Sequence, residues 1–296
     1  MPQTEAQVDC ALEADNYLGE TPVWSVAEQA LYWVNCENPP QLHRWRPGGA
    51  HEVWPMPMRV GGLVLRAGGG ALVVLADGLY DFDPADGRLE RRVASPLPGH
   101  VKLHECQCDR QGRLWVGAYD HHFTPTNRDS RGGSFFRLDG GTLTPVIEGI
   151  SVANGLAVSP DGRILYASDS PTRTVEAFDL DPASGALSNR RPFIALKEGE
   201  GFVDGAAVDA EGCYWLAAVG VGQLRRYRPD GALDRVVQLP CSNPTKPVFG
   251  GADLDVIYVT STRLPISVPG VQGAGRNGGL FAVRAGVSGL ADALLS

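Results

Sequence analysis

Three oxygen-bearing side chains are the strongest candidates for chemistry in this chain. Glu20, Asn154 and Asp204 each begin a short apolar segment, and glycine directly follows the last two. Carboxylate and amide oxygens suit Ca²⁺, Mg²⁺ or Mn²⁺, and Zn²⁺ or Fe²⁺ also accepts them. Two converging carboxylates repel one another unless a cation or a shared proton lies between them. The three residues therefore predict a site for one divalent metal ion.

A repeated segment places these residues at equivalent positions in the chain. Each copy runs from its first residue into an alternating apolar strand, then through a turn with glycine into a second strand rich in aromatic residues. The first residues, called ring positions below, are 20, 61, 104, 154, 204 and 245, at intervals of 41 to 50 residues. Asn-Gly and Asp-Gly also occur in ordinary turns, but the common register favours a shared site.

Six units of this length, with three or four short strands each, predict an all-β fold: a six-bladed β-propeller with a central channel. We expect one domain over residues 1–296, with the ring positions at one mouth of the channel. The segment before Leu18 should add the outer strand of the last blade, near Gly279 to Val283. That closure would remove free sheet edges.

The composition narrows the classes of partner. The net charge is −8 and no run of Lys or Arg stands out, so nucleic-acid binding has no support. No segment approaches the ~20 apolar residues of a membrane span, and the first 16 residues lack the apolar core of a signal peptide. We therefore expect a cytoplasmic protein without a membrane partner, while the oligomeric state is not defined. The six cysteines form no C-x-x-C pair and are expected to be reduced core residues.

Several motifs resemble one known family. The segments Leu18–Trp24, Asn154–Ala157, Ser159–Gly162 and Asp204–Gly205 are similar to motifs of the gluconolactonase / senescence marker protein (regucalcin) / luciferin-regenerating-enzyme family. Two later elements, Lys246-Pro247 and Gly278–Phe281, extend the resemblance over nearly the whole chain. The resemblance implies a six-bladed propeller with one divalent metal held by Glu20, Asn154 and Asp204. It also implies hydrolysis of sugar lactones to aldonic acids.

The substrate-facing motifs depart from that family. Its usual Arg-x-Asn-Asp reads Lys-Leu-His-Glu over residues 102–105, and Gly-Thr-Met with polar residues after it reads Gly-Ala-Tyr-Asp-His-His over residues 117–122. Lys102 keeps a charge but lacks the planar fork of arginine. His104 adds a titratable ring that can join a metal site. Glu105, next to it on a strand, is expected to point away from the channel. The three residues that match the family's metal ligands are present, while the residues that match its substrate contacts are different. This difference weakens the case for gluconolactone as the substrate.

The first hypothesis is metal-dependent hydrolysis of a sugar lactone to the aldonic acid. Glu20 and Asn154 fix the metal, and Asp204 is both ligand and general base. Substrate contacts are expected from Lys102, His104, Tyr119, His121 and His122. The His-His pair also fits a solvated loop. The remaining histidines, His43, His51 and His100, are expected to be structural or exposed.

Two other classes of function fit the same residues. The propeller could bind a sugar acid or another small anion without turnover, stabilised by its metal. It could also hydrolyse non-sugar lactones or other esters, with the Pro- and Gly-rich segment Ser261–Gly275 as a lid. A serine hydrolase is not supported, because the chain has no G-x-S-x-G motif.

Overall fold

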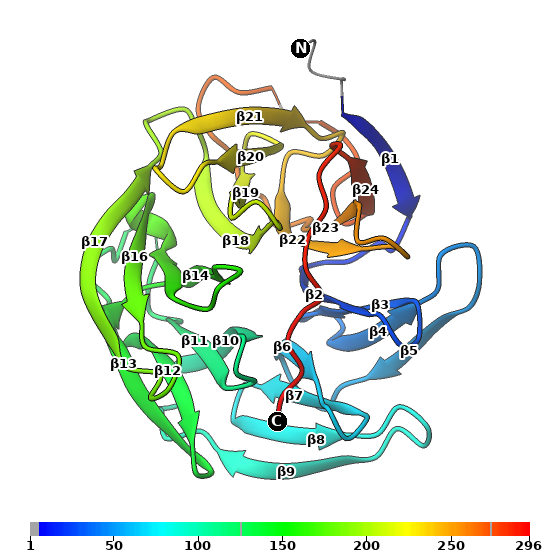
Figure 1. Cartoon of the computed structure of the whole chain (residues 1–296), viewed down its shortest axis with the longest axis vertical. Helices are drawn as coiled ribbons and strands as arrows, with labels where there is room; N and C mark the ends of the chain where they lie inside the picture. Colours follow the sequence, from blue (N-terminus) through cyan, green and yellow to red (C-terminus); the bar gives the residue numbers. More distant parts are fainter. Residues whose placement is uncertain (1–5, 125, 273) are drawn as a thin grey trace.

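The structure is a computed structural model that describes residues 6–124, 126–272 and 274–296. Within these residues, 24 strands form six four-stranded sheets around a central axis (Figure 1). One 3-10 turn, η1 (Ser170–Thr172), follows the second strand of the fourth sheet. No helix in the described part of the chain is long and apolar enough to cross a membrane. The predicted all-β six-bladed propeller is confirmed.

Five blades follow the chain from the innermost strand to the outermost. Blade 1 holds β2 (Gly19–Ser25), β3 (Ala30–Asn35), β4 (Gln41–Trp45) and β5 (His51–Pro55). Blade 2 holds β6 (Val60–Leu65), β7 (Ala71–Leu75), β8 (Gly78–Phe82) and β9 (Leu89–Ala94). Blade 3 holds β10 (Val101–Cys108), β11 (Leu114–Asp120), β12 (Gly133–Asp139) and β13 (Thr142–Ile150). Blade 4 holds β14 (Ala153–Val158), β15 (Ile164–Asp169), β16 (Thr174–Leu180) and β17 (Leu187–Ala195). Blade 5 holds β18 (Phe202–Val208), β19 (Tyr214–Val219), β20 (Gln223–Tyr227) and β21 (Leu233–Gln238).

Blade 6 closes the ring with strands from both ends of the chain. It is built from β22 (Pro244–Gly250), β23 (Val256–Ser261), β24 (Leu280–Arg284) and β1 (Gln7–Leu12). The first and last strands pair antiparallel, with Gln7 opposite Arg284 and Cys10 opposite Phe281. The predicted closure by the N-terminal segment is therefore confirmed, and β24 is not left as a free edge.

The core lies between blades. Six clusters of buried hydrophobic side chains each join two neighbouring blades, the last one joining blade 6 to blade 1. Tight turns after the innermost strands are held by buried aspartates. Asp209 accepts hydrogen bonds from the Glu211 and Cys213 amides and from the Trp215 indole, and Asp109 does the same in blade 3. Each turn thus locks a buried tryptophan of the second strand in place.

Every innermost strand carries a bulge near its start. Asn154 of β14 pairs with Ser168 of β15, and Ala157 pairs with Tyr166. Between these pairs β14 advances three residues while β15 advances two, so β14 contains one extra residue. The same extra residue occurs at the ring position of all six blades. A bulge interrupts the two-residue alternation of side chains and re-aims them locally. It therefore controls which side chains reach the channel.

The C-terminal segment straps the end of the channel opposite the ring positions. In Figure 1 it crosses the centre of the ring from blade 6 toward blade 2. Gly289 bridges Asp209, the Leu295 amide donates to the Leu65 carbonyl, and the Ser296 amide donates to Gly112. These partners lie at or beyond the ends of the innermost strands, whereas the ring positions lie at their starts. The mouth at the ring positions is therefore the end left open by the strap.

Candidate functional site

The three predicted metal ligands lie at the mouth of the channel on β2, β14 and β18. Glu20, Asn154 and Asp204 are all buried, with exposures of 1 %, 5 % and 7 %. The carboxyl groups of Glu20 and Asp204 are close enough to hydrogen-bond one another. Both Asn154 and Asp204 lie inside strands. The alternative that they serve only ordinary turns is therefore wrong.

Burial makes the two acidic groups reluctant to ionise without a cation. Burial raises the pKa of Glu20 to about 7, although Lys246 and the Thr21 amide favour its charged form. Burial, followed by repulsion from Glu20 and Glu105, raises the pKa of Asp204 well above its usual value. Two adjacent carboxyls that resist ionisation together must share a proton or a cation. The electrostatics of the pair therefore fits a cation site.

Asn154 offers a side-chain oxygen that no other described residue uses. Its amide nitrogen donates to Ser170 Oγ at 2.8 Å, while Ser170 Oγ lies 2.7 Å from the Val203 carbonyl. The hydroxyl has one proton and gives it to that carbonyl, so it can only accept from Asn154. Asn154 Oδ1 is thereby turned away from Ser170, and it is buried without a hydrogen-bond partner among the described residues. A buried acceptor left open is rare in proteins, and a metal ion would satisfy it.

A buried ion pair crosses the channel beside the three predicted metal ligands. Lys246 Nζ of blade 6 lies 3.0 Å from Glu105 Oε2 of blade 3, and both side chains are at most 5 % exposed. Blades 3 and 6 face one another across a ring of six, so the pair spans the axis. The other Glu105 oxygen accepts from the Leu156 amide at 3.0 Å. The expectation that Glu105 points away from the channel is wrong, because the bulge between Leu103 and Cys106 breaks the alternation.

Gly205 makes room for that ion pair. A Cβ at Gly205 would lie 2.5 Å from Cβ and Cγ of Lys246, which leaves no space for any other residue type. The Lys246 side chain can therefore cross the channel only past a glycine. When ionised, the three carboxylates and one ammonium group carry two net negative charges, which one divalent cation would balance.

Four of the five predicted substrate-facing residues form one wall of the mouth in blade 3. Lys102 on β10 pairs with Tyr119 on β11. The rings of His104 and Tyr119 meet edge to face at 5.6 Å, and Tyr119 Oη lies 3.1 Å from Nδ1 of His121. Burial, and then the charges of Arg59 and Lys246, hold the pKa of His104 well below its usual value. The wall therefore presents a neutral imidazole at neutral pH.

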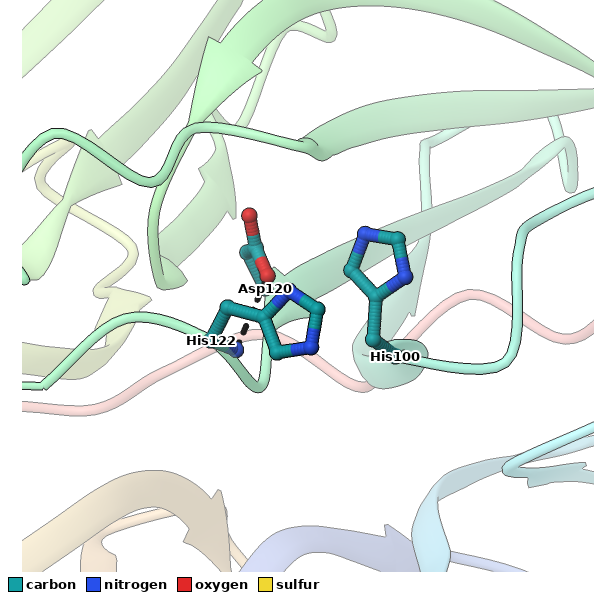
Figure 2. Close-up of side chains that lie close together, drawn as sticks. All are labelled: His100, Asp120 and His122. Atoms are coloured by element: carbon teal, nitrogen blue, oxygen red, sulfur yellow. Dashed lines mark hydrogen bonds between the residues drawn. The ribbon is translucent and has the colours of Figure 1, made fainter.

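His122 lies in a different group of side chains. Its ring stacks on that of His100 with centroids 4.2 Å apart, and Asp120 lies beside them (Figure 2). One ligand atom from each of the three lies within 4.8 Å of the others, so they form a second set that could hold a cation. His100 was expected to be only structural or exposed, but its ring is part of this cluster.

The other histidines and the cysteines follow the sequence interpretation. His43 Nδ1 lies 3.0 Å from His51 Nε2, and both rings stack on Trp33. Burial lowers the pKa of His43 to about 3, so this pair is a structural element of blade 1. All six cysteines are free, and five of them are buried.

The segment proposed as a lid runs along blades 5 and 6, with residue 273 outside the described residues. Val268 packs into the cluster between blades 4 and 5, close to Gly220. The Leu264 carbonyl accepts a hydrogen bond from the Asn243 side chain at 3.0 Å. Near its other end, the Ala274 amide donates to Ser242 Oγ at 2.6 Å, so the described part of the segment is tied down along its length.

Sequence reasoning missed Ser170 and Arg59. Ser170 orients Asn154, but it lies 16 residues away in η1 and no motif marks it. Arg59 lies two residues before ring position 61, as Lys102 lies two before position 104. Its guanidinium covers the Tyr119 ring at 4.7 Å and reaches within 3.4 Å of His104 Nδ1. The repeat register could have identified Arg59 as a neighbour of Lys102 on the mouth.

Known proteins resemble this chain along its whole length. A 6-deoxy-6-sulfogluconolactonase of Pseudomonas putida is 37 % identical over 292 residues, covering 97 % of this chain and 98 % of that protein. An L-arabinolactonase of Azospirillum brasilense is 33 % identical over 299 residues, covering 99 % and 97 %. The solved structure of a calcium-binding protein, regucalcin, from Agrobacterium tumefaciens strain C58 superposes with a TM-score of 0.86 at 26 % identity, covering 96 % and 95 %.

The family assignment follows from the extent of a further match. Residues 18–263 match the family described as the SMP-30/Gluconolactonase/LRE-like region. The matched segment contains all six ring positions and most of the propeller. The chain therefore belongs to the SMP-30/gluconolactonase/LRE-like family.

Proposed function

We propose that this protein hydrolyses a sugar lactone to the aldonic acid, using one divalent metal ion held by Glu20, Asn154 and Asp204. The observation that carries the proposal is the open, buried Asn154 Oδ1 in one ring with two carboxyls that resist ionisation together. Relatives at 37 % and 33 % identity that span nearly the whole chain are named lactonases of two different sugars. They support the reaction class and leave the sugar open.

The chain's own residues prepare the site for this reaction. A bound divalent ion would supply Lewis acidity that polarises the lactone carbonyl. The Thr21 amide orients the Glu20 carboxylate at 2.9 Å, and Ser170 orients Asn154. Asp204 in its ionised form takes a proton from the attacking water. The new bond joins the water oxygen to the carbonyl carbon, the bond from that carbon to the ring oxygen breaks, and Asp204 returns the proton to the ring oxygen.

The wall of blade 3 would orient the sugar. Neutral His104 accepts at Nδ1 on the side of Arg59, which leaves its Nε2 proton for a substrate oxygen. Lys102, Tyr119 and His121 add donors along the same wall, and His122 borders it through the neighbouring residue His121. We propose these five residues as the substrate contacts. Since the family's usual Arg and Asn are replaced here, the wall is suited to a sugar other than gluconolactone.

Calcium is the first metal to test. The donor set is all oxygen, which suits Ca²⁺, Mg²⁺ and Mn²⁺ better than the softer transition metals. The Agrobacterium structure with the same fold is described as a calcium-binding protein. Zn²⁺ and Fe²⁺ remain in the panel because His104 lies on the neighbouring wall.

The deciding experiment measures acid release from aldono-1,4- and 1,5-lactones by chelator-treated protein, with each metal added back. We expect turnover to return with a divalent metal and to be abolished in Asp204→Asn. If metal and sugar acids raise the melting temperature but no lactone is opened faster than in buffer, the protein is a binding module and the proposal is wrong. Turnover of only non-sugar lactones would assign the same site to a different hydrolase.

A further inference from the structure

We infer that the lactone carries a negatively charged substituent, a sulfonate, phosphate or carboxylate group, and that Arg59 binds it at the edge of the mouth. This inference rests on the proposed function and names the substrate class of the same site. It depends on the position of Arg59, on contacts that leave its guanidinium incompletely bonded, and on the uneven distribution of charge around the mouth.

Arg59 reaches from one blade over the substrate wall of the next. The residue directly precedes β6 of blade 2, yet its guanidinium lies over the ring of Tyr119 in blade 3, with Cζ 4.7 Å from the ring centroid. One nitrogen lies 3.4 Å from His104 Nδ1 and another 3.4 Å from the Leu103 carbonyl. The guanidinium therefore lies against residues that would contact the sugar.

The hydrogen-bonding capacity of Arg59 is largely unused. N–H···O bonds in proteins usually span about 2.7–3.2 Å, whereas the polar contacts of this guanidinium with the described residues are 3.4 Å or longer. Its Nε is buried without a hydrogen-bond partner among the described residues. The nearest carboxylate, Glu37 Oε2, lies 3.9 Å from Nε. The side chain is only 14 % exposed, so water does not fully replace the missing partners.

An oxyanion would complete this environment. A buried charge is tolerated when it is paired and hydrogen-bonded, and a guanidinium presents its donors in a planar fork that fits two oxygens of one anion. Contacts with Tyr119, His104 and the Leu103 carbonyl already restrict the guanidinium, so less freedom is lost on binding.

The charge around the mouth is uneven. The residues two positions before the ring positions are Leu18, Arg59, Lys102, Val152, Phe202 and Asn243. The two cations are on adjacent blades, and the positions on blades 4 and 5 are apolar. The Lys102 ammonium group makes no hydrogen bond or ion pair with other described residues, so its charge is also available. Among these six positions, only those on blades 2 and 3 therefore offer a cation to an anionic group, although the Glu37 carboxylate lies 3.9 Å from Arg59 Nε.

The test compares matched lactones that differ only in the charged group: an uncharged hexonolactone and its sulfonate, phosphate and carboxylate derivatives at the terminal carbon. We expect the wild-type protein to prefer at least one charged lactone in kcat/KM. In Arg59→Met that preference should fall by about 10- to 100-fold, the value of a lost charged hydrogen bond. The change should appear chiefly in KM, and Arg59→Lys should be intermediate.

Arg66 supplies the control. It lies just beyond the other end of β6 and pairs with Asp81 at 2.6 Å, so Arg66→Met removes a charge from the same blade without touching the mouth. Melting temperatures of all variants show whether each one folds. If Arg59→Met does not fold, Arg59→Lys and Lys102→Met carry the comparison.

The outcomes separate this inference from the proposed function. Hydrolysis without preference for any charged lactone, or a preference that Arg59→Met and Arg59→Lys both retain, overturns the role of Arg59 and leaves the lactonase intact. If no lactone is opened with any metal, the lactonase proposal fails. The inference is then decided by melting-temperature shifts with the sulfonated and unsubstituted sugar acids, which should differ in the wild type and not in Arg59→Met.

Discussion

Two groups of side chains in this propeller could hold a cation, and they are built in opposite ways. The buried set of Glu20, Asn154 and Asp204 draws one residue from each of three blades, in strands far apart in sequence. The cluster of His100, Asp120 and His122 (Figure 2) comes from one blade, with His100 half-buried and His122 exposed.

The two candidate cation sites differ in how the protein hydrogen-bonds their carboxyl groups. Burial alone would raise the pKa of Asp120, but donors from Ser130, Gly132 and the His122 amide outweigh it and hold that pKa below its usual value. Its charge is thus stabilised by the protein itself. Burial instead raises the pKa values of Glu20 and Asp204, and Asn154 Oδ1 has no hydrogen-bond partner among the described residues. A set whose oxygens are not satisfied by the protein has more to gain from a cation.

The largest expected effect distinguishes the two groups directly. Asp204→Asn removes a proposed ligand and the proposed base, so lactone turnover should fall by at least about 10³-fold, within the range for loss of a general base. The steady-state rate of acid release measures it. Asp120→Asn, matched in chemistry, should keep turnover within about tenfold of the wild type provided that it folds. Equal losses in two folded variants would place Asp120 in the reaction and contradict the comparison.

A smaller effect, on metal affinity, is expected from changing Ser170, which orients Asn154. Ser170→Ala removes the hydroxyl that holds the Asn154 amide group, so the free oxygen is no longer directed by the protein. Loss of such a supporting partner typically lowers metal affinity by about 10- to 100-fold, which calorimetric titration with Ca²⁺ would measure. Ser168→Ala is the control, since that hydroxyl donates to the Thr174 carbonyl within blade 4. Unchanged affinity in Ser170→Ala would mean that Asn154 does not bind the metal.

The pH dependence of stability is a further consequence of the buried pair. Because the pKa of Glu20 is raised from 4.5 to about 7, the metal-free native state holds a proton that the unfolded chain releases over this window. Stability of the metal-free protein should therefore fall as the pH rises from 4.5 to 7, by up to about 3 kcal/mol from this group. Asp204 contributes with the same sign.

Denaturant titrations at several pH values measure this dependence. Added Ca²⁺ should oppose the loss, because binding requires the ionised carboxylates, and Glu20→Gln should flatten the profile of the metal-free protein. Stability of the metal-free wild type that rises with pH over this window would contradict the protonated pair.

The fold could be predicted from the sequence more completely than the wall of blade 3 proposed to contact the substrate. The repeat register defined the six blades, the closure by residues before Leu18 and the convergence of Glu20, Asn154 and Asp204. The repeat register gave the wrong direction for the Glu105 side chain. A bulge re-aims side chains, and the alternation of apolar residues in the sequence does not reveal it. Arg59 was visible in the register but not in any motif. The Ser170 contact and the stacking of His100 on His122 depend on residues outside the strands, whose positions no period defines.

The smallest effect on metal binding is expected from the cluster of His100, Asp120 and His122. Nitrogen ligands favour Zn²⁺, Ni²⁺ or Cu²⁺ over Ca²⁺, and the Asp120 oxygens already accept hydrogen bonds from Ser130, Gly132 and His122. His122→Ala should therefore leave the Ca²⁺ affinity within about twofold and reduce only weak Zn²⁺ binding, with no gain of turnover from Zn²⁺ at this cluster. Calorimetry with each metal on wild type, His122→Ala and His51→Ala measures it. A large fall in Ca²⁺ affinity in His122→Ala alone would show that the two groups act as one centre.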